Sequence, residues 1–374
     1  MLKKTRMALT VCLAAIVVLA LAACATLGSE GKGDVGLPTA GVGPFRRLVS
    51  SEVPGIAPFV LDGEGGYREP AVLAEDPASA EPRVLLFAEA SLGGRDGTPR
   101  RPVLVRSRAV DGRSFAGTGF PPGRGIEVVL EASEPWEGGV VTAPALLRVK
   151  SEVWLFYGGQ GGIGLAISQD GGHSFTKRPG PVLGSLGSAP WEGGPPGAPS
   201  AYLEGDSVHL FYAAGGFLGE AVSPPGAPPR FTRTDPVPAT PGLDPVLSPS
   251  PPVEPSSLAP GEKPPFDESG LGDPCVVPRL TPAGRVHIRV LYTGLGAGGK
   301  TAIGFAARYG HSGPLARQAT PVYAAKGKER SPALLDLGER AFLYFTEPRA
   351  SDAREAIGGA FSPGNGSPGP LVEP

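Results

Sequence analysis

The chain has 374 residues, a formal net charge of −2, 57 glycines and 45 prolines. A nearly neutral chain lacks the basic footprint of a nucleic-acid-binding protein, which argues against such a partner. The many glycines and prolines favour an architecture of short strands and frequent turns. Since all-β rings are often long single domains, one domain is compatible with this length.

The first 23 residues have the features of a signal peptide. Three basic residues precede an apolar run over 7–23, which ends in Leu-Ala-Ala-Cys at Cys24. The run is shorter than the about 20 apolar residues that a transmembrane helix needs. Leu-Ala-Ala-Cys resembles the lipobox of bacterial lipoproteins. The resemblance implies that Cys24 carries acyl chains such as palmitate and anchors the chain to the cell envelope, at the outer membrane or cell surface. A plain secretory signal is the alternative.

Two further segments and the cysteines limit the organisation of the chain. Residues 24–44 are small and glycine-rich, which is typical of a flexible tether. Residues 236–265 are proline-rich and cannot hold a ladder of strand hydrogen bonds, so we expect a surface loop. With Cys12 in the signal peptide and Cys24 acylated, Cys275 is left without a disulfide partner. Its apolar neighbours predict a buried, inert thiol.

One sequence repeat occurs five times after the tether. Each copy ends in a proline, which precedes a short apolar run and a second run that ends in an aromatic residue. The prolines are Pro70, Pro144, Pro199, Pro274 and Pro332. Short β-branched and aromatic runs separated by glycine predict antiparallel meanders. Five such units predict an all-β fold, a five-bladed β-propeller over 45–374 with four-stranded blades that start near residues 69, 143, 198, 273 and 331.

The second copy predicts the strands of one blade most clearly. We expect strands over 145–149, 152–157 and 163–168, and a fourth from Ser174. A glycine in the third strand, Gly164 in this copy, is expected to avoid a clash with the next blade. The last blade needs an outer strand from elsewhere. Residues 45–48 are one candidate, which would close the ring and remove an exposed edge, and residues 371–372 are the other.

Residues 168–175 (SQDGGHSF) resemble the Asp-box turn of sialidases and related propellers. The resemblance implies that Asp170 stabilises the turn between the third and fourth strands. A looser copy at 107–115 gives Asp111 the same structural role.

Several features together resemble the five-bladed propeller glycosidases, which include arabinanases, β-xylosidases, invertases and levansucrases. They are Trp-Glu before the first strand, the pre-strand proline, the aromatic end of the second strand and Ile-Gly-x-Ala-x-Ser-x-Asp-Gly. The resemblance covers residues 58–362 as a repeat pattern and includes no catalytic signature. It implies three carboxylates on the innermost strands of the first three blades: a base or nucleophile, a pKa modulator and a general acid.

The chain does not have all three expected carboxylates at the matching positions. The residues before the five prolines are Glu69, Ala143, Ala198, Asp273 and Ser331. Glu69 stands in the place of the first carboxylate, and alanine occupies the second and third places. Asp273 has the right local sequence but belongs to the fourth blade. Glu69 and Asp273 are therefore the candidate catalytic pair.

Other side chains could bind a sugar at the mouth of the funnel. Three acids stand seven residues before a repeat proline: Glu137, Glu192 and Asp267. For these three acids, and for Glu89 and Glu347, which follow second strands, the alternative to a role in the site is a solvated loop acid or a partner in an ion pair. Trp136 and Trp191 could stack on a sugar face or pack between blades.

The chain has four histidines, which lie far apart in the sequence. His209 and His287 are expected inside second strands, and His173 and His311 in turns. Their spacing indicates no metal site, and the sequence predicts no cofactor. We therefore predict a monomer that binds a glycan at the cell surface and has lost catalysis. The alternative is an active glycoside hydrolase that uses Glu69 and Asp273.

Overall fold

The computed structural model describes residues 43–48, 59–61, 66–75, 83–92, 101–109, 112, 115, 126–187, 189–225, 229–280, 284–337, 340–349 and 354–362. The predicted signal peptide and Cys24 lie outside these ranges, as does Asp111. Within them, no helix is both long and apolar enough to cross a membrane.

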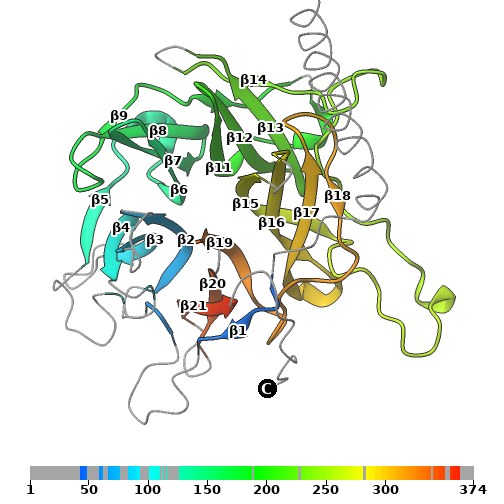
Figure 1. Ribbon diagram of the computed structural model, residues 1–374. Coiled ribbons are helices and arrows are strands. Elements are labelled where there is room, and N and C mark those ends of the chain that lie inside the picture. The colour runs from blue at the N-terminus through cyan, green and yellow to red at the C-terminus, as the bar shows by residue number, and fades with distance from the viewer. Residues whose placement is uncertain are drawn as a thin grey trace, which may run out of the picture. The chain divides into compact units, whose positions relative to one another are not determined.

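Five antiparallel sheets surround a central axis, so the predicted five-bladed β-propeller is confirmed (Figure 1). Blade 1 consists of β2 (Tyr67–Ala74), β3 (Val84–Leu92), β4 (Arg101–Ala109) and β5 (Glu127–Leu130). Blade 2 consists of β6 (Thr142–Val149), β7 (Glu152–Gly159), β8 (Gly162–Ser168), β9 (Thr176–Lys177) and β10 (Leu183–Gly184). Blade 3 consists of β11 (Gly197–Glu204), β12 (Ser207–Ala214), β13 (Phe217–Ser223) and β14 (Thr232–Arg233).

The last two blades follow the same plan. Blade 4 consists of β15 (Gly270–Leu280), β16 (Val286–Leu295), β17 (Thr301–Tyr309) and β18 (Ala316–Arg317). Blade 5 consists of β19 (Arg330–Asp336), β20 (Ala341–Pro348), β21 (Glu355–Ser362) and, from the start of the chain, β1 (Arg46–Arg47). In the described part of the chain, four 3₁₀ turns lie between strands: η2 (Pro135–Glu137), η3 (Pro190–Glu192), η4 (Pro255–Ser257) and η5 (Ala297–Gly299). In each blade the strand that contains the repeat proline lies nearest the axis (Figure 1).

The N-terminal segment closes the ring. β1 pairs antiparallel with β21, with Arg46 opposite Phe361 and Arg47 opposite Ala360. The chain returns to the same strand where Leu61 bridges Ile357. The prediction that 45–48 supply the outer strand of blade 5 is therefore confirmed, while the alternative at 371–372 lies outside the described residues.

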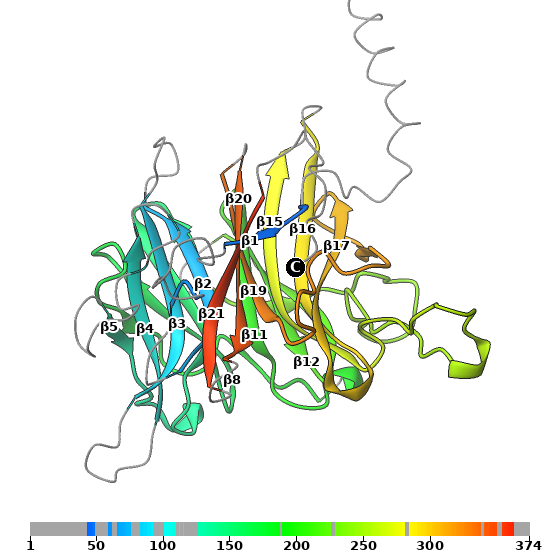
Figure 2. The same ribbon diagram turned by 90° about the horizontal axis from the view of Figure 1, so that it is seen from below.

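The core fills the spaces between neighbouring sheets. One cluster joins residues of blade 2 such as Phe156 to Leu210 of blade 3, and another joins Leu291 of blade 4 to Leu343 of blade 5. Because a middle strand packs on both faces, its residues are buried without alternation, as in β7. The strands slope away from the axis in the side view (Figure 2).

Residues 236–265 form a loop that leaves the ring between blades 3 and 4 (Figures 1 and 2). The loop contains only η4 and an isolated bridge from Leu247 to Leu218 on β13. This irregular conformation is what a proline-rich composition predicts.

The Asp-box turn has the predicted structural role. Asp170 Oδ1 accepts the backbone N–H groups of His173 and Ser174, both at 3.0 Å, and the hydroxyl of Ser168 at 2.7 Å. The Ser174 hydroxyl donates to Asp170 Oδ2 at 2.6 Å. Hydrogen bonds from the hydroxyl and the backbone N–H of Ser174 are the main cause that lowers the pKa of Asp170. Asp170 therefore holds the turn between β8 and β9 as a charged acceptor.

The glycine of the third strand is required for a different reason from the predicted one. Gly164 lies opposite Tyr157 in the register of blade 2, and a Cβ at Gly164 would lie 2.5 Å from Tyr157 Cζ and 2.6 Å from a Trp136 ring carbon. The expected clash with the next blade is wrong, because the obstructing ring comes from the second strand of the same blade. The equivalent glycines in blades 3 to 5 face aromatic rings in the same way: Gly219, Gly304 and Gly358.

This contact predicts that Gly164→Ala destabilises the fold. Forcing a methyl group into the packed Tyr157 and Trp136 rings should lower the free energy of unfolding by about 1–3 kcal/mol. Denaturant unfolding followed by tryptophan fluorescence measures it. Gly197→Ala is the matched control, since an added Cβ there meets no atom within 4 Å. Equal losses in the two variants would contradict this explanation.

Candidate functional site

All five innermost strands have a β-bulge at the residue before the repeat proline. The strand register shifts between Arg68 and Ala71 in blade 1 and between Gly272 and Cys275 in blade 4, with the same shift in the other three. The bulged residues have positive φ: Glu69 (55°), Ala143 (45°), Ala198 (46°), Asp273 (46°) and Ser331 (52°). A side chain in this conformation is strained, and bulges next to active sites re-aim side chains.

The five bulged residues and their prolines line a cavity at the axis. Its volume is about 30 Å³, enough for one or two water molecules. Ligand pockets for small molecules commonly measure about 300–1,000 Å³. A sugar ring therefore does not fit between the bulges and would have to lie above them.

Three carboxyl groups approach one another beside this cavity. Burial raises the pKa of Glu69 well above its usual 4.5, and the charge and hydrogen bond of Glu89 and the charge of Asp273 raise it further. The Ala143 N–H, which lies 2.6 Å from Glu69 Oε2, opposes the rise. Glu89 pairs with Arg68 through Oε1. Glu89 Oε2 is buried and has no hydrogen-bond partner among the described residues.

Asp273 is held by hydroxyl groups from two blades. Its Oδ2 accepts the hydroxyls of Thr293 and Ser331, each at 2.9 Å. The Ser331 N–H donates to Thr293 Oγ1 at 2.8 Å, and the Glu69 N–H donates to Thr346 Oγ1 at 2.8 Å. The axial polar groups therefore cross-link neighbouring blades.

Sequence reasoning missed these two threonines. Thr293 directly follows Tyr292, and Thr346 directly follows Phe345, so both occupy the position after the aromatic residue that ends the second strand. A repeat pattern extended by one residue past this aromatic would have included both threonines as candidates for the axis. Glu89 was identified only as an acid after a second strand, and its approach to Glu69 depends on the bulge.

The three acids seven residues before a repeat proline lie in buried ion pairs. Glu137 accepts the Tyr157 hydroxyl at 2.8 Å and Lys177 Nζ at 2.6 Å. Glu192 and Asp267 repeat the arrangement in blades 3 and 4, with Tyr212 and Arg233 at 2.7 and 2.5 Å, and with Tyr292 and Arg317 at 2.8 and 3.2 Å. Although burial opposes it, backbone and Lys177 hydrogen bonds lower the pKa of Glu137. These contacts match the ion-pair alternative.

A cation from the outermost strand reaches each of these acids across the third strand. It stands opposite alanine in the strand register: Lys177 opposite Ala166, Arg233 opposite Ala221 and Arg317 opposite Ala306. Blade 5 uses Arg47, opposite Ala360, which pairs with the buried Glu347. We call this unit the outer-strand latch: a cation on the outermost strand, a small residue on the third strand and a buried acid.

Both tryptophans pack beside the latches. The Trp136 and Tyr157 ring centroids are 5.8 Å apart, and those of Trp191 and Tyr212 are 6.1 Å apart. Trp191 Nε1 also donates to the Leu243 carbonyl at 2.8 Å. Each ring is half-buried, and one face is occupied by a tyrosine.

Cys275 lies next to the axial cluster. Its Sγ accepts the Leu334 N–H at 3.3 Å, and burial raises the pKa of the thiol to about 11. At neutral pH the thiol stays protonated and is not a nucleophile, as the apolar neighbours predict. Cys275 is partly exposed, so the predicted full burial is wrong.

Solved structures resemble this chain over most of its length. A glycoside hydrolase aligns with a TM-score of 0.56 and 15% identity, over 92% of this chain and 97% of the other. The catalytic domain of the Coprinopsis cinerea GH62 alpha-L-arabinofuranosidase gives 0.53 and 11%, over 82% and 95%. A GH62 hydrolase in complex with xylotriose gives 0.53 and 13%, over 82% and 95%. At these identities the likeness is one of fold, and at that level it confirms the predicted resemblance to propeller glycosidases. No protein-family model and no curated protein sequence matches the chain.

The raised pKa of Glu69 predicts a pH-dependent stability. Folded Glu69 keeps a proton that the unfolded chain releases above about pH 4.5, so the wild-type free energy of unfolding should fall as the pH rises from 4.5 through the raised pKa. Glu69→Gln supplies a neutral donor at every pH. It should be more stable than the wild type at pH 8, by about 1–3 kcal/mol, and equal to it near pH 4.

Urea unfolding of the two proteins between pH 4 and pH 8 measures this difference. Glu131→Gln, which changes an exposed acid, should follow the wild-type curve at every pH. A Glu69→Gln curve parallel to that of the wild type would show that folding does not change the pKa of Glu69.

Proposed function

We propose that the propeller binds a glycan above its axial cluster and does not hydrolyse it. The observation that carries the proposal is the convergence of five bulged residues on one axis, where Glu69, Asp273 and Ser331 supply polar groups. Carboxyl and hydroxyl groups are suitable partners for sugar hydroxyls. The similar solved structures support the choice of ligand, since they are glycoside hydrolases by name and one contains xylotriose.

The composition of the axis supports the loss of catalysis. Glycoside hydrolysis needs two carboxyl groups on opposite sides of the scissile bond, one of them a proton donor. Blades 2 and 3 present Ala143 and Ala198 at the bulges, and neither side chain can transfer a proton. Asp273 accepts two hydroxyl hydrogen bonds that join blades 4 and 5, which favours a structural role for this carboxylate.

One observation favours hydrolysis as the second candidate function. Glu69 has a raised pKa beside two other carboxyl groups, Glu89 and Asp273, and a protonated acid near a carboxylate is the usual arrangement of a general acid. In that case Glu69 would protonate the leaving group and Asp273 would activate water. The two functions differ in whether product is formed.

A screen against arabinan, xylan, fructan and mannan oligosaccharides separates the two functions. Calorimetry measures binding, and the release of reducing ends measures hydrolysis. We expect binding of one glycan class without product. Glu69→Gln should retain the affinity within about twofold because its amide can still hydrogen-bond, whereas Glu69→Ala should weaken it about tenfold.

Three results would contradict the binding function. Product that disappears in both Glu69→Gln and Asp273→Asn would establish the hydrolase. Affinity that is unchanged in Glu69→Ala would place the glycan away from the axis. A complete lack of binding would exclude all four glycan classes. Glu131→Gln is the control for an unrelated acid, and thermal unfolding of each variant checks that the ring is intact.

We further propose that Cys24 carries the lipid that anchors the chain to the cell envelope. The support is the sequence of residues 1–24, with basic residues, an apolar run and Leu-Ala-Ala-Cys. Multiple acyl chains on one residue hold a protein at a membrane, since a single chain binds only marginally. Residues 24–44 would then separate the ring from the bilayer.

Metabolic labelling with an alkyne analogue of palmitate tests the anchor. The wild type expressed in a bacterium should incorporate the label and sediment with membranes. Cys24→Ala should incorporate none and should appear in the soluble fraction or keep an uncleaved signal. Cys275→Ala should behave like the wild type. Equal labelling of the wild type and Cys24→Ala would exclude acylation at Cys24.

A further inference from the structure

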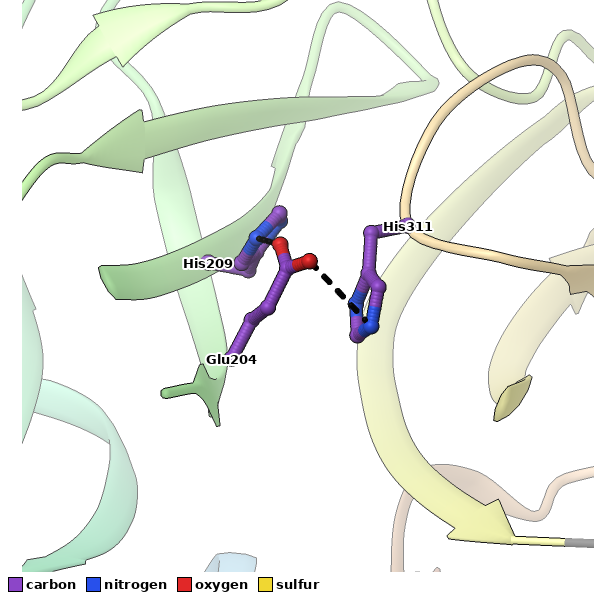
Figure 3. A group of neighbouring side chains, drawn as sticks. All are labelled: Glu204, His209 and His311. Atoms are coloured by element: carbon purple, nitrogen blue, oxygen red, sulfur yellow. Dashed lines mark hydrogen bonds and ion pairs between the residues drawn. The ribbon is translucent and has the colours of Figure 1, made fainter. Parts of the chain in front are cut away.

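Three side chains from two blades meet beside the end of β11. Glu204 lies at the end of β11, His209 on β12, and His311 in the loop after β17 (Figure 3). His209 Nε2 is 2.8 Å from Glu204 Oε2, and His311 Nε2 is 3.4 Å from Glu204 Oε1. One ligand atom of each residue lies within 4.8 Å of those of the other two.

The His209 ring lies between two carboxylates. Its Nδ1 is 2.9 Å from Glu220 Oε1, and its Nε2 is 2.8 Å from Glu204 Oε2. An Nδ1–H that donates to Glu220 orients the ring, because a carboxylate only accepts. Nε2 is then the nitrogen placed to bind a metal ion together with Glu204.

His311 is oriented in a similar way. Its Nδ1 lies 3.2 Å from the Tyr202 hydroxyl, which leaves Nε2 directed at Glu204. The Tyr202 ring stacks on both imidazoles, with centroids 4.6 Å from His209 and 5.8 Å from His311. In both rings Nδ1 faces a partner outside the site, and Nε2 faces the Glu204 carboxylate.

A second shell of charge supports the cluster. Glu220 is buried, and Arg308 donates to both of its oxygens at 2.8 Å and to the His311 carbonyl at 2.7 Å. Glu220 still accepts the His209 N–H, which is the carboxylate–histidine arrangement that orients metal-binding imidazoles. Because Arg308 neutralises Glu220, Glu204 is the anionic ligand that would face a cation.

We propose that Glu204, His209 and His311 bind a divalent transition-metal ion of the zinc class and thereby cross-link blades 3 and 4. Two imidazole nitrogens and one carboxylate oxygen, with a fourth position open to solvent, form a common Zn²⁺ ligand set. Imidazole ligands disfavour Ca²⁺ and Mg²⁺, which take oxygen ligands. In tetrahedral geometry at about 2.0–2.1 Å, neighbouring ligand atoms lie roughly 3.3 Å apart. The His311 pair already has this spacing, and the His209 pair must open by about 0.5 Å.

The proposed metal site is separate from the axial cluster. Glu204 lies six residues along β11 from Ala198, which corresponds to about 20 Å of strand. The ligands come from one hairpin and from a loop of the next blade, so no short sequence motif contains them. The sequence prediction of no metal site rested on spacing along the chain, which cannot detect a ligand set of this kind.

Calorimetric titration of the full-length chain with Zn²⁺ tests the proposal. The protein is purified in detergent without a histidine tag and is stripped with a chelator. We expect one Zn²⁺ per chain with a dissociation constant below about 10 μM, a higher melting temperature with Zn²⁺, and no response to Mg²⁺. Co²⁺ should give the visible absorption of a four-coordinate nitrogen and oxygen site.

Variants locate the ion. Glu204→Gln and His311→Ala change partly exposed ligands and should each weaken Zn²⁺ binding at least tenfold, with the fold retained in the absence of metal. His173→Ala and Cys275→Ser are controls that should leave the affinity unchanged. A wild type that binds no Zn²⁺ below 100 μM would overturn the proposal and identify the cluster as an ion pair. Zn²⁺ binding that survives both ligand variants would overturn it by placing the ion elsewhere.

Discussion

The ring depends on a backbone conformation that an L-residue before proline adopts only under constraint. Five such residues have φ between 45° and 55°, at a cost of about 1–2 kcal/mol each. At three of the five, a side chain of a neighbouring blade accepts a hydrogen bond from the strained residue: Thr346 from Glu69 N–H, Glu69 from Ala143 N–H, and Thr293 from Ser331 N–H. The strained residues and the contacts that hold them are thus one network around the axis.

This network limits what the axial acids can do. A carboxylate that fixes the neighbouring backbone must keep its hydrogen bonds, whereas a catalytic carboxylate must exchange them during the reaction. Asp273 accepts hydroxyls from blades 4 and 5, and burial together with the neighbouring Glu89 and Asp273 raises the pKa of Glu69. The proposed binding function rests on this arrangement of fixed donors and acceptors.

Sequence periodicity was sufficient for the architecture and insufficient for the side-chain partners. Each copy carries its own proline and aromatic residue, and four of the five carry the third-strand glycine, so the repeat predicts five blades. The strand that closes the ring was predicted only as one of two candidates, residues 45–48 or 371–372. The acids seven residues before the prolines were ambiguous because their partners stand on strands of two residues, such as Thr176–Lys177 and Thr232–Arg233. Strands this short have no hydrophobic pattern. The histidine cluster was missed because it forms across blades.

The outer-strand latch explains how such short strands stay attached. A strand of two residues has few backbone hydrogen bonds, so its cation supplies a further contact with the blade: Lys177, Arg233, Arg317 and Arg47 each reach a buried acid. The alanine opposite the cation leaves room for the cation's side chain. The glycine two residues earlier leaves room for the aromatic ring of the second strand. These two requirements account for Gly-x-Ala in the third strand. Blade 1 has no such alanine and reverses the charges, with Arg106 on β4 and Glu127 on the outer strand, 2.8 Å apart. Its outer strand has four residues, so backbone pairing contributes more there. In blade 5 the latch is also the closure of the ring, because Arg47 belongs to the first strand of the fold.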